Sequence, residues 1–192
     1  ADVLRGLFAR VDIDPALVGH VVGGTVNQVG YQSANVTRTA WLIADLPLEV
    51  PAITVNAQCG SSQEALTVGL GLVGSGLIDV AVACGVETMS RIPLGSTAPD
   101  EPDYGKPKAG TYPEHYDPTT QFEGAERIAE RWELTKEELD AFGKRSQDLA
   151  ARAWAEGRFE SQIIPVEAPV TDDAGKVVGT KTFDRDEGLR ET

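Results

Sequence analysis

The chain has 192 residues and a formal net charge of −13, with 30 acidic and 17 basic side chains. This acidity argues against a nucleic-acid partner, because few cations are left to neutralise a phosphate backbone. Two cysteines and two histidines form neither a disulfide framework nor a metal site. No apolar run is long enough for a membrane span, and no cleavable leader is visible. We therefore expect a cytoplasmic protein without nucleic acid, membrane or metal.

The first part of the chain predicts a helix, a strand and a second helix. Apolar residues recur at helical spacing over 3–11, and an apolar run over 18–22 is typical of a strand. A polar loop follows. Ser33 stands where it can cap a helix over 34–44.

The central stretch, 52–87, has the pattern of a strand–helix–strand unit. Apolar runs at 53–55 and 78–83 are typical of buried strands, and the segment 61–75 between them has Glu64 as its only charge. A unit with these proportions is a right-handed crossover between parallel strands. The alternation of helices and strands predicts an α/β fold with a largely parallel sheet and a buried central helix.

Cys59 lies where the first strand of this unit ends and its helix begins. Backbone N–H groups converge at such a junction and the helix dipole favours negative charge, so a thiol there is driven toward thiolate. Gly60 lets another molecule approach the backbone closely. The alternative is an inert, buried cysteine. The small polar neighbours of Cys59 favour a nucleophile.

The remainder of the chain changes in character. The segment 91–121 holds six of the eleven prolines, and a loop of this length is typical of a lid or a linker; we expect an ordered lid. Helices are predicted over 122–133 and from Thr135, which begins a capping box, to Gly157. Their apolar stripes are expected to face a core. Alternating residues over 163–183 predict a hairpin.

Five segments resemble one protein family in the same order. The sequence VNAQCGSS at Val55–Ser62 resembles the nucleophile motif of thiolases, the acyl-CoA C-acyltransferases, whose shared core is V-N-x-x-C-x-S-G/S. The sequence GVETMS at Gly85–Ser90 is similar to a second thiolase segment. The other three similar segments lie at 26–38, at 125–130 and within 145–159. The resemblance covers essentially the whole chain.

The resemblance implies a thiolase-like layered fold in two parts. Residues 1–90 correspond to the N-terminal core without its first strand, and residues 91–192 to the loop domain with its proline-rich lid, two helices and hairpin. The C-terminal half of a thiolase, with a histidine in G-H-P, a water-holding asparagine and a cysteine in C-x-G, has no counterpart here. We expect a homodimer or homotetramer, or a partner chain that supplies this half. Without that half, this chain is expected not to catalyse repeated turnovers of substrate.

The resemblance also assigns roles to residues. Cys59 is the nucleophile that forms an acyl thioester, and its own backbone N–H is one oxyanion donor. Independently of the resemblance, Glu87 and Met89 follow the second strand of the central unit, and because α/β sheets bind ligands beyond the carboxyl ends of their strands, we expect them at the floor of the Cys59 pocket; the alternative is a purely structural turn. Gln121 and Phe122 stand where many thiolases have a methionine and a glycine, which favours a bulky acyl group. Acyl-CoA and coenzyme A are the implied substrates, and no tightly bound cofactor is implied.

The implied activity is thiolytic cleavage of a 3-ketoacyl-CoA, or the reverse Claisen condensation, in the degradation of fatty acids or of steroids. Two alternatives stay open. A condensing enzyme of the ketosynthase type has a similar fold and nucleophile but takes acyl groups from a carrier protein. A non-catalytic subunit with a thiolase-like fold would keep the fold for assembly alone.

Overall fold

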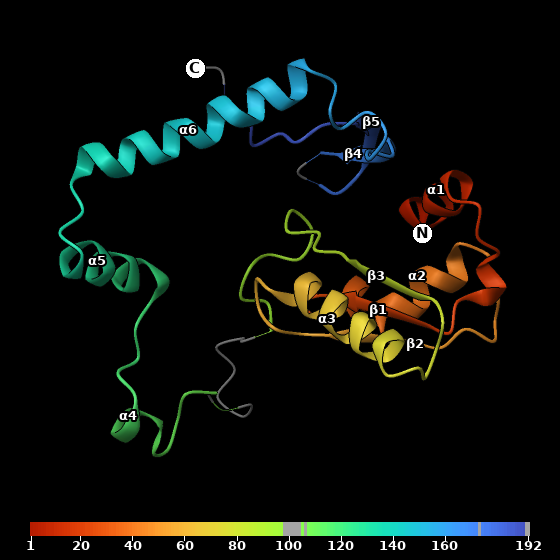
Figure 1. Cartoon of the computed structure of the whole chain (residues 1–192), viewed down its shortest axis with the longest axis horizontal. Helices are drawn as coiled ribbons and strands as arrows, with labels where there is room; N and C mark the ends of the chain where they lie inside the picture. The colour runs from red at the N-terminus through yellow and green to blue at the C-terminus, as the bar shows by residue number, and fades with distance from the viewer. Residues whose placement is uncertain (98–104, 106, 173, 191–192) are drawn as a thin grey trace. The chain divides into compact units, whose positions relative to one another are not determined.

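The computed structural model describes residues 1–97, 105, 107–172 and 174–190 (Figure 1). The chain divides into two compact units, residues 1–102 and residues 103–192. Positions 98–104 and 106 of the expected lid lie outside the described residues, as does Asp173 of the predicted hairpin turn. No described helix combines the length and the apolar character needed to cross a bilayer.

The first unit is a parallel sheet with helices. Its elements are α1 (Asp2–Arg10), β1 (His20–Gly24), α2 (Val36–Ile43), β2 (Ala52–Val55), α3 (Ser61–Gly74) and β3 (Ala81–Gly85), with short 3-10 turns at Pro15–Leu17 and Gly30–Gln32. The strand order is β2-β1-β3, and β1 pairs in parallel with both neighbours. Val22 is aligned with Ile53 on one side and with Ala83 on the other. The predicted α/β fold class is confirmed.

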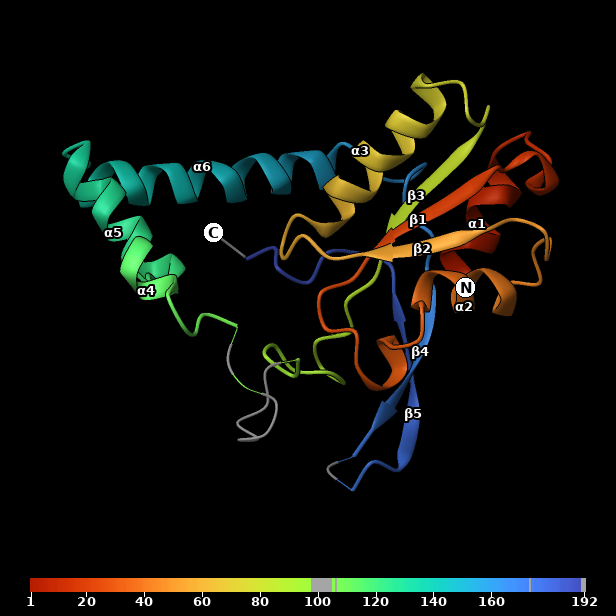
Figure 2. The ribbon, with the colours of Figure 1, turned by 90° about the horizontal axis from the view of Figure 1, so that it is seen from below.

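The two glycines at the end of β1 face different layers of helices. A Cβ on Gly23 would lie 2.1 Å from Oγ1 of Thr37 in α2, and a Cβ on Gly24 would lie 2.4 Å from the carbonyl carbon of Ser61 in α3. Successive residues of a strand face opposite sides of a sheet. The helices α2 and α3 therefore cover opposite faces, and Figure 2 shows α1 and α2 on one side of the strands and α3 on the other.

The core lies on the α1–α2 side of the sheet and is built around Trp41. This side chain is fully buried, its Nε1 donates a hydrogen bond of 2.8 Å to the carbonyl of Pro47, and its ring meets that of Phe8 edge-on at 5.7 Å. The buried residues of the cluster are Leu4, Val18, Val21, Trp41, Ala44, Val50 and Val82. Because the indole N–H of Trp41 has this acceptor, its burial leaves no donor unpaired, and the apolar area of the ring stabilises the core.

The helix α3 is buried on one side only. Ser61, Ala65 and Gly69 face the sheet, and a Cβ on Gly69 would lie 3.5 Å from that of Ala81 in β3. The opposite side is apolar and exposed, with Leu70 at 64% exposure. The central helix that the sequence predicts as buried thus keeps an uncovered apolar side in this chain.

Two predicted boundaries are wrong. The cap of α2 is Asn35, not Ser33, because Asn35 adopts φ 57° and its side chain accepts a hydrogen bond from the N–H of Arg38. Asparagine is among the few residues that tolerate this left-handed conformation. The strand β3 begins at Ala81 rather than at residue 78. Since β1 begins at His20, which pairs with Ala81, the ladder between the two strands begins there.

The second unit contains helices and a hairpin. Its elements are α4 (Tyr112–His115), α5 (Gln121–Arg131), α6 (Lys136–Ala155), β4 (Val166–Thr171) and β5 (Val177–Phe183). The capping box at Thr135 is confirmed: its hydroxyl accepts from the N–H of Glu138, whose carboxylate accepts from the N–H of Thr135. The predicted hairpin is also confirmed, with β4 and β5 antiparallel. Gly157 follows α6 with φ 67°, as expected of a helix stop.

The apolar stripes of α5 and α6 do not face a core in this chain, contrary to the prediction. Neither helix has a buried residue, and Trp132 and Phe142 are 59% and 73% exposed. Helical spacing of apolar residues defines a face, but only a second layer of structure buries it.

Candidate active site

Cys59 lies in a tight corner between β2 and α3 that is held by its own hydrogen bonds. The side-chain oxygen of Asn56 accepts from the N–H of Gln58 at 2.9 Å, and Gln58 adopts φ 53°. The hydroxyl of Ser61 accepts from the N–H of Ala57 at 3.0 Å and donates to the carbonyl of Gln58. The corner therefore has one defined conformation, which places Cys59 directly before the helix.

Glycines bring this corner against the ends of two strands. Gly24 ends β1, and Gly85 ends β3. A Cβ on Gly24 would lie 2.4–2.6 Å from backbone atoms of Ser61 and Ser62, and a Cβ on Gly85 would lie 2.0 Å from the hydroxyl oxygen of Ser62. Without side chains at these two positions, the first turn of α3 rests on the strand backbone. Cys59 is thereby set at the carboxyl edge of the sheet, where α/β proteins bind ligands.

An open depression of about 450 Å³ adjoins Cys59. It is lined by Gly24, Thr25, Val26, Asn27, Gln58, Cys59, Ser61, Ser62, Gly85, Val86, Glu87, Met89 and Leu94. The structure thus brings together Cys59, Glu87 and Met89 in one depression. Cys59 is exposed, so its thiol is accessible from solvent. Gln121 and Phe122 belong to the second unit, in the first turn of α5, and their role stays a prediction.

The backbone N–H of Cys59 has no acceptor among the described residues. Neighbouring N–H groups are occupied: that of Gly60 donates to the carbonyl of Ala57 at 3.1 Å, and that of Ser61 to the carbonyl of Gln58 at 3.0 Å. A free N–H next to a thiol is one donor of the kind that stabilises an oxyanion.

Glu87 is the second ionisable group of the depression, and its carboxylate is fully engaged. It accepts hydrogen bonds from the N–H of Val26 at 2.8 Å, from Nε2 of Gln32 at 2.9 Å, and from the side chain and N–H of Asn27 at 3.1 and 3.3 Å. Partial burial by itself raises the pKa of Glu87, but these hydrogen bonds outweigh it and lower the pKa below its ordinary value. The carboxylate is therefore ionised and a poor proton acceptor.

Sequence reasoning missed the partners of Glu87. Asn27 and Gln32 are buried polar residues in a loop about 60 positions before Glu87, and the sequence offers no measure of that distance in space. The only available signal was the polar character of the loop itself, since buried amides require partners.

Cys84 differs from Cys59 in its surroundings. It is half-buried in β3, and burial raises the pKa of its thiol above the ordinary value. It lines a separate cavity of about 280 Å³ with Leu4, Val36 and Ala40. A buried thiol with a raised pKa is a packing residue.

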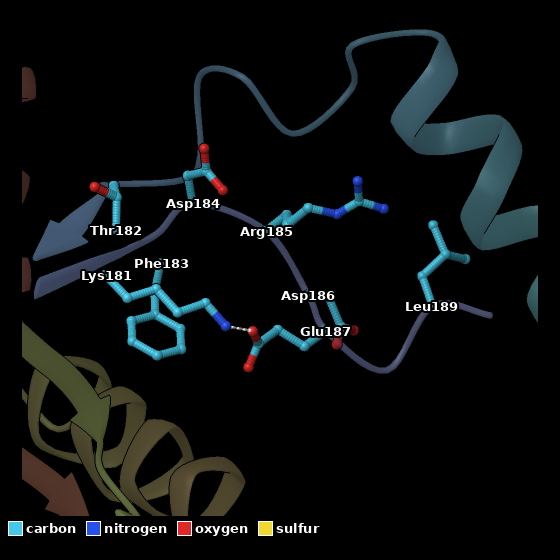
Figure 3. Close-up of a pocket in the computed structure, with 8 residues that line it drawn as sticks. All are labelled: Lys181, Thr182, Phe183, Asp184, Arg185, Asp186, Glu187 and Leu189. Carbon is cyan, nitrogen blue, oxygen red and sulfur yellow. Dashed lines mark hydrogen bonds and ion pairs between the residues drawn. The ribbon is translucent and has the colours of Figure 1, made fainter. Parts of the chain in front are cut away.

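The second unit has a depression along the end of β5 and the residues that follow it (Figure 3). Figure 3 shows Lys181 paired with Glu187, while Arg185 points away from that pair. Lys181 also lies over the ring of Phe183, 4.7 Å from its centroid. The pair is half-exposed on both sides, and such surface ion pairs are common and weak. No cysteine lines this depression, so the depression at Cys59 is the better candidate.

Comparison with known proteins gives concordant matches. The family described as thiolase, N-terminal domain, matches residues 1–192. The steroid 3-ketoacyl-CoA thiolase FadA6 of Mycobacterium tuberculosis is 41% identical over 169 residues, which are 85% of this chain and 42% of that protein. The human peroxisomal 3-ketoacyl-CoA thiolase is 34% identical over 98% of this chain and 43% of its own length.

A solved structure agrees with these matches. The acetyl-CoA acetyltransferase of Bacillus anthracis has a TM-score of 0.76 and 28% identity, over 98% of this chain and 48% of that one. The chain therefore spans less than half the length of these relatives.

Proposed function

This chain belongs to the thiolase family, and we propose that it is the nucleophile-bearing part of an acyl-CoA C-acyltransferase. The reaction is thiolytic cleavage of a 3-ketoacyl-CoA, or the reverse condensation. The observation that carries the proposal is the exposed thiol of Cys59 in an open depression at the carboxyl edge of a parallel sheet, next to a backbone N–H that has no acceptor among the described residues.

In the cleavage direction, the sulfur of Cys59 attacks the C3 carbonyl of the 3-ketoacyl-CoA. The carbonyl oxygen becomes an oxyanion, which the N–H of Cys59 stabilises. When the carbonyl re-forms, the C2–C3 bond breaks, its electron pair passes to C2, and C2 takes up a proton to give acetyl-CoA. The acyl group remains on Cys59 as a thioester. The thiolate of a second coenzyme A then attacks this thioester, which releases the shortened acyl-CoA and restores the cysteine thiolate.

Both half-reactions are rapid only with a group that moves protons at the thiols and at C2, whereas a single slow acylation of Cys59 can use water in its place. Among the described residues that line the depression, Cys59 and Glu87 are the ionisable ones, and the Glu87 carboxylate is held ionised by four hydrogen bonds. We therefore propose that residues outside 1–192 supply the acid and base, either from the same protein or from a partner in a cytoplasmic oligomer.

The acyl group that fits this depression is bulky and apolar. Val26, Val86, Met89 and Leu94 contribute apolar side chains to its lining, and Met89 is 55% exposed, so it can pack against a ligand. The mycobacterial relative is named as a thiolase of steroid substrates. Gln121 and Phe122 are the further residues that we expect to contact such an acyl group.

The test is intact-mass measurement of the purified chain after incubation with acetoacetyl-CoA. We expect a gain of one acetyl group, which a Cys59→Ser variant does not show. The matched control is Cys84→Ser, which removes the other cysteine and should be acetylated like the unsubstituted chain. Acetylation that persists in Cys59→Ser, or none in the unsubstituted chain, would contradict the proposal.

The same measurement separates the alternatives. A condensing enzyme of the ketosynthase type would be acylated faster by an acyl carrier protein thioester than by the corresponding acyl-CoA. A non-catalytic subunit would not be acylated by either, although its Cys59 is exposed to alkylating reagents. Sustained thiolysis by the isolated chain would contradict the proposal that the acid and base lie elsewhere.

A further inference from the structure

The Glu87 carboxylate holds the loop over residues 26–32 against the segment that follows β3. Four donors from Val26, Asn27 and Gln32 converge on its two oxygens at 2.8–3.3 Å. Gln32 is held in turn, since its Oε1 accepts from the N–H and the hydroxyl of Thr88 at 2.6 and 2.8 Å. Hydrogen bonds to an ionised acceptor are roughly twice as strong as neutral ones. The carboxylate thereby fixes the Val26 peptide unit relative to the sheet.

A second set of contacts leads from Val26 to Cys59. The carbonyl of Val26 accepts from Nδ2 of Asn56 at 3.1 Å. This bond leaves the Asn56 side-chain oxygen aimed at the N–H of Gln58, 2.9 Å away. Gln58 has φ 53°. This left-handed conformation is unfavourable for residues other than glycine and persists only where surrounding contacts hold it. Cys59 is the next residue.

We propose that Glu87 is a positioning residue for Cys59. Its carboxylate fixes the Val26 peptide, the Val26 carbonyl orients the Asn56 amide, and this amide holds the left-handed turn at Gln58 that sets the direction of the thiol. The proposal rests on the function proposed above, because it takes Cys59 as the nucleophile. A role for Glu87 as the base itself is disfavoured, since both of its oxygens are already occupied.

The experiment compares Glu87→Gln, Asn56→Ala and the double variant with the unsubstituted chain. Glu87→Gln keeps the size of the side chain but removes the charge and turns an amide donor toward other donors. Gln28→Ala is the control in the same loop: Gln28 is exposed, and its amide donates to the carbonyl of Thr25 rather than to Glu87. Far-UV circular dichroism verifies that each variant is folded.

Two rates are measured. The first is the single-turnover acetylation of Cys59 by acetoacetyl-CoA, as a maximum rate and a half-saturating concentration. The second is alkylation of Cys59 by iodoacetamide, which needs no acyl substrate, with Cys84 followed as the internal reference. We expect Glu87→Gln and Asn56→Ala each to lower the maximum acetylation rate on the order of tenfold to a hundredfold, with little change in half-saturation and a slower alkylation of Cys59 alone.

The double variant decides whether the two residues act as a unit. If Glu87 acts through Asn56, the double variant is no slower than the slower single variant. Additive losses, a loss confined to the half-saturating concentration, or unchanged rates in folded Glu87→Gln would overturn the proposal. If the unsubstituted chain is not acetylated, the proposed function fails. The iodoacetamide rates then decide the positioning role by themselves, through the same comparison of single and double variants.

Discussion

The substitution Gly24→Ala tests the idea that a bare strand backbone sets the place of Cys59. The new Cβ would lie 2.4 Å from the carbonyl carbon of Ser61, 2.5 Å from the nitrogen of Ser62 and 2.6 Å from the carbonyl oxygen of Ser61. All three are backbone atoms, so no side chain can rotate away. The first turn of α3 must move by about 1 Å to reach ordinary van der Waals contact.

The magnitude follows from two opposing terms. Overpacking of this kind costs about 1–3 kcal/mol, while alanine in place of glycine recovers roughly 0.5–1 kcal/mol of backbone entropy. The overpacking term is the larger, so we expect the free energy of unfolding to fall by about 1–2 kcal/mol. A displacement of about 1 Å at the nucleophile should lower the acetylation rate of Cys59 on the order of a hundredfold.

Urea titration followed by circular dichroism gives the stability, and intact mass gives the acetylation rate. Gly71→Ala is the matched control, because this glycine lies in α3 itself and a Cβ there would meet no atom within 4 Å. It should stabilise the chain by roughly 0.5–1 kcal/mol and leave Cys59 unaffected. Equal stability and equal Cys59 reactivity in Gly24→Ala and the unsubstituted chain would refute the reasoning.

Further substitutions probe other contacts. Gly85→Ala should destabilise the chain less than Gly24→Ala, because its closest clash, at 2.0 Å, is with the hydroxyl of Ser62, and urea titrations should show partial recovery when Ser62→Ala is added. Trp41→Phe should lower the free energy of unfolding by about 1–3 kcal/mol, since the smaller ring leaves a space in the core, while the Pro47 carbonyl keeps the N–H of Val50 as a donor; an unchanged urea midpoint would contradict this. Because the pKa of Glu87 is lowered in the folded chain, its contribution to stability is present above the unfolded-state pKa and is lost as the pH falls through the folded-state pKa. Urea titrations at decreasing pH should therefore show a smaller loss of stability in Glu87→Gln. Thr135→Ala removes a confirmed capping box and should cost about 1 kcal/mol, seen as reduced helical signal on warming.

Local patterns predicted the elements of the fold well. The strand–helix–strand unit around Cys59 was recognisable because its apolar runs and its nearly uncharged helix are properties of adjacent residues. The capping box at Thr135 was recognisable for the same reason, as both of its hydrogen bonds span three positions. The sequence also pointed to Cys59, and to Glu87 and Met89 at the floor of its pocket, because all three follow the carboxyl ends of strands.

What was missed depends on contacts between distant residues. Ser33 and Asn35 are both good caps by residue type, and the choice between them rests on the bonds of Asn35 to β2, where it donates to the carbonyl of Ala52 and accepts from the hydroxyl of Thr54. The start of β3 depends on where β1 begins. The exposure of α5 and α6 depends on whether another layer packs against them, which no periodicity reports.

The paired glycines of β1 have a mechanical consequence. Side chains between a sheet and a helix usually change rotamer and so absorb small displacements. At Gly23 and Gly24 the strand contributes no side chain, so the side chain of Thr37 in α2 and the backbone of Ser61 in α3 approach the strand backbone at adjacent residues. The two helices are thus coupled through two adjacent residues of β1. We therefore expect a displacement of α2 at Thr37 to reach the first turn of α3, which follows the corner that carries Cys59.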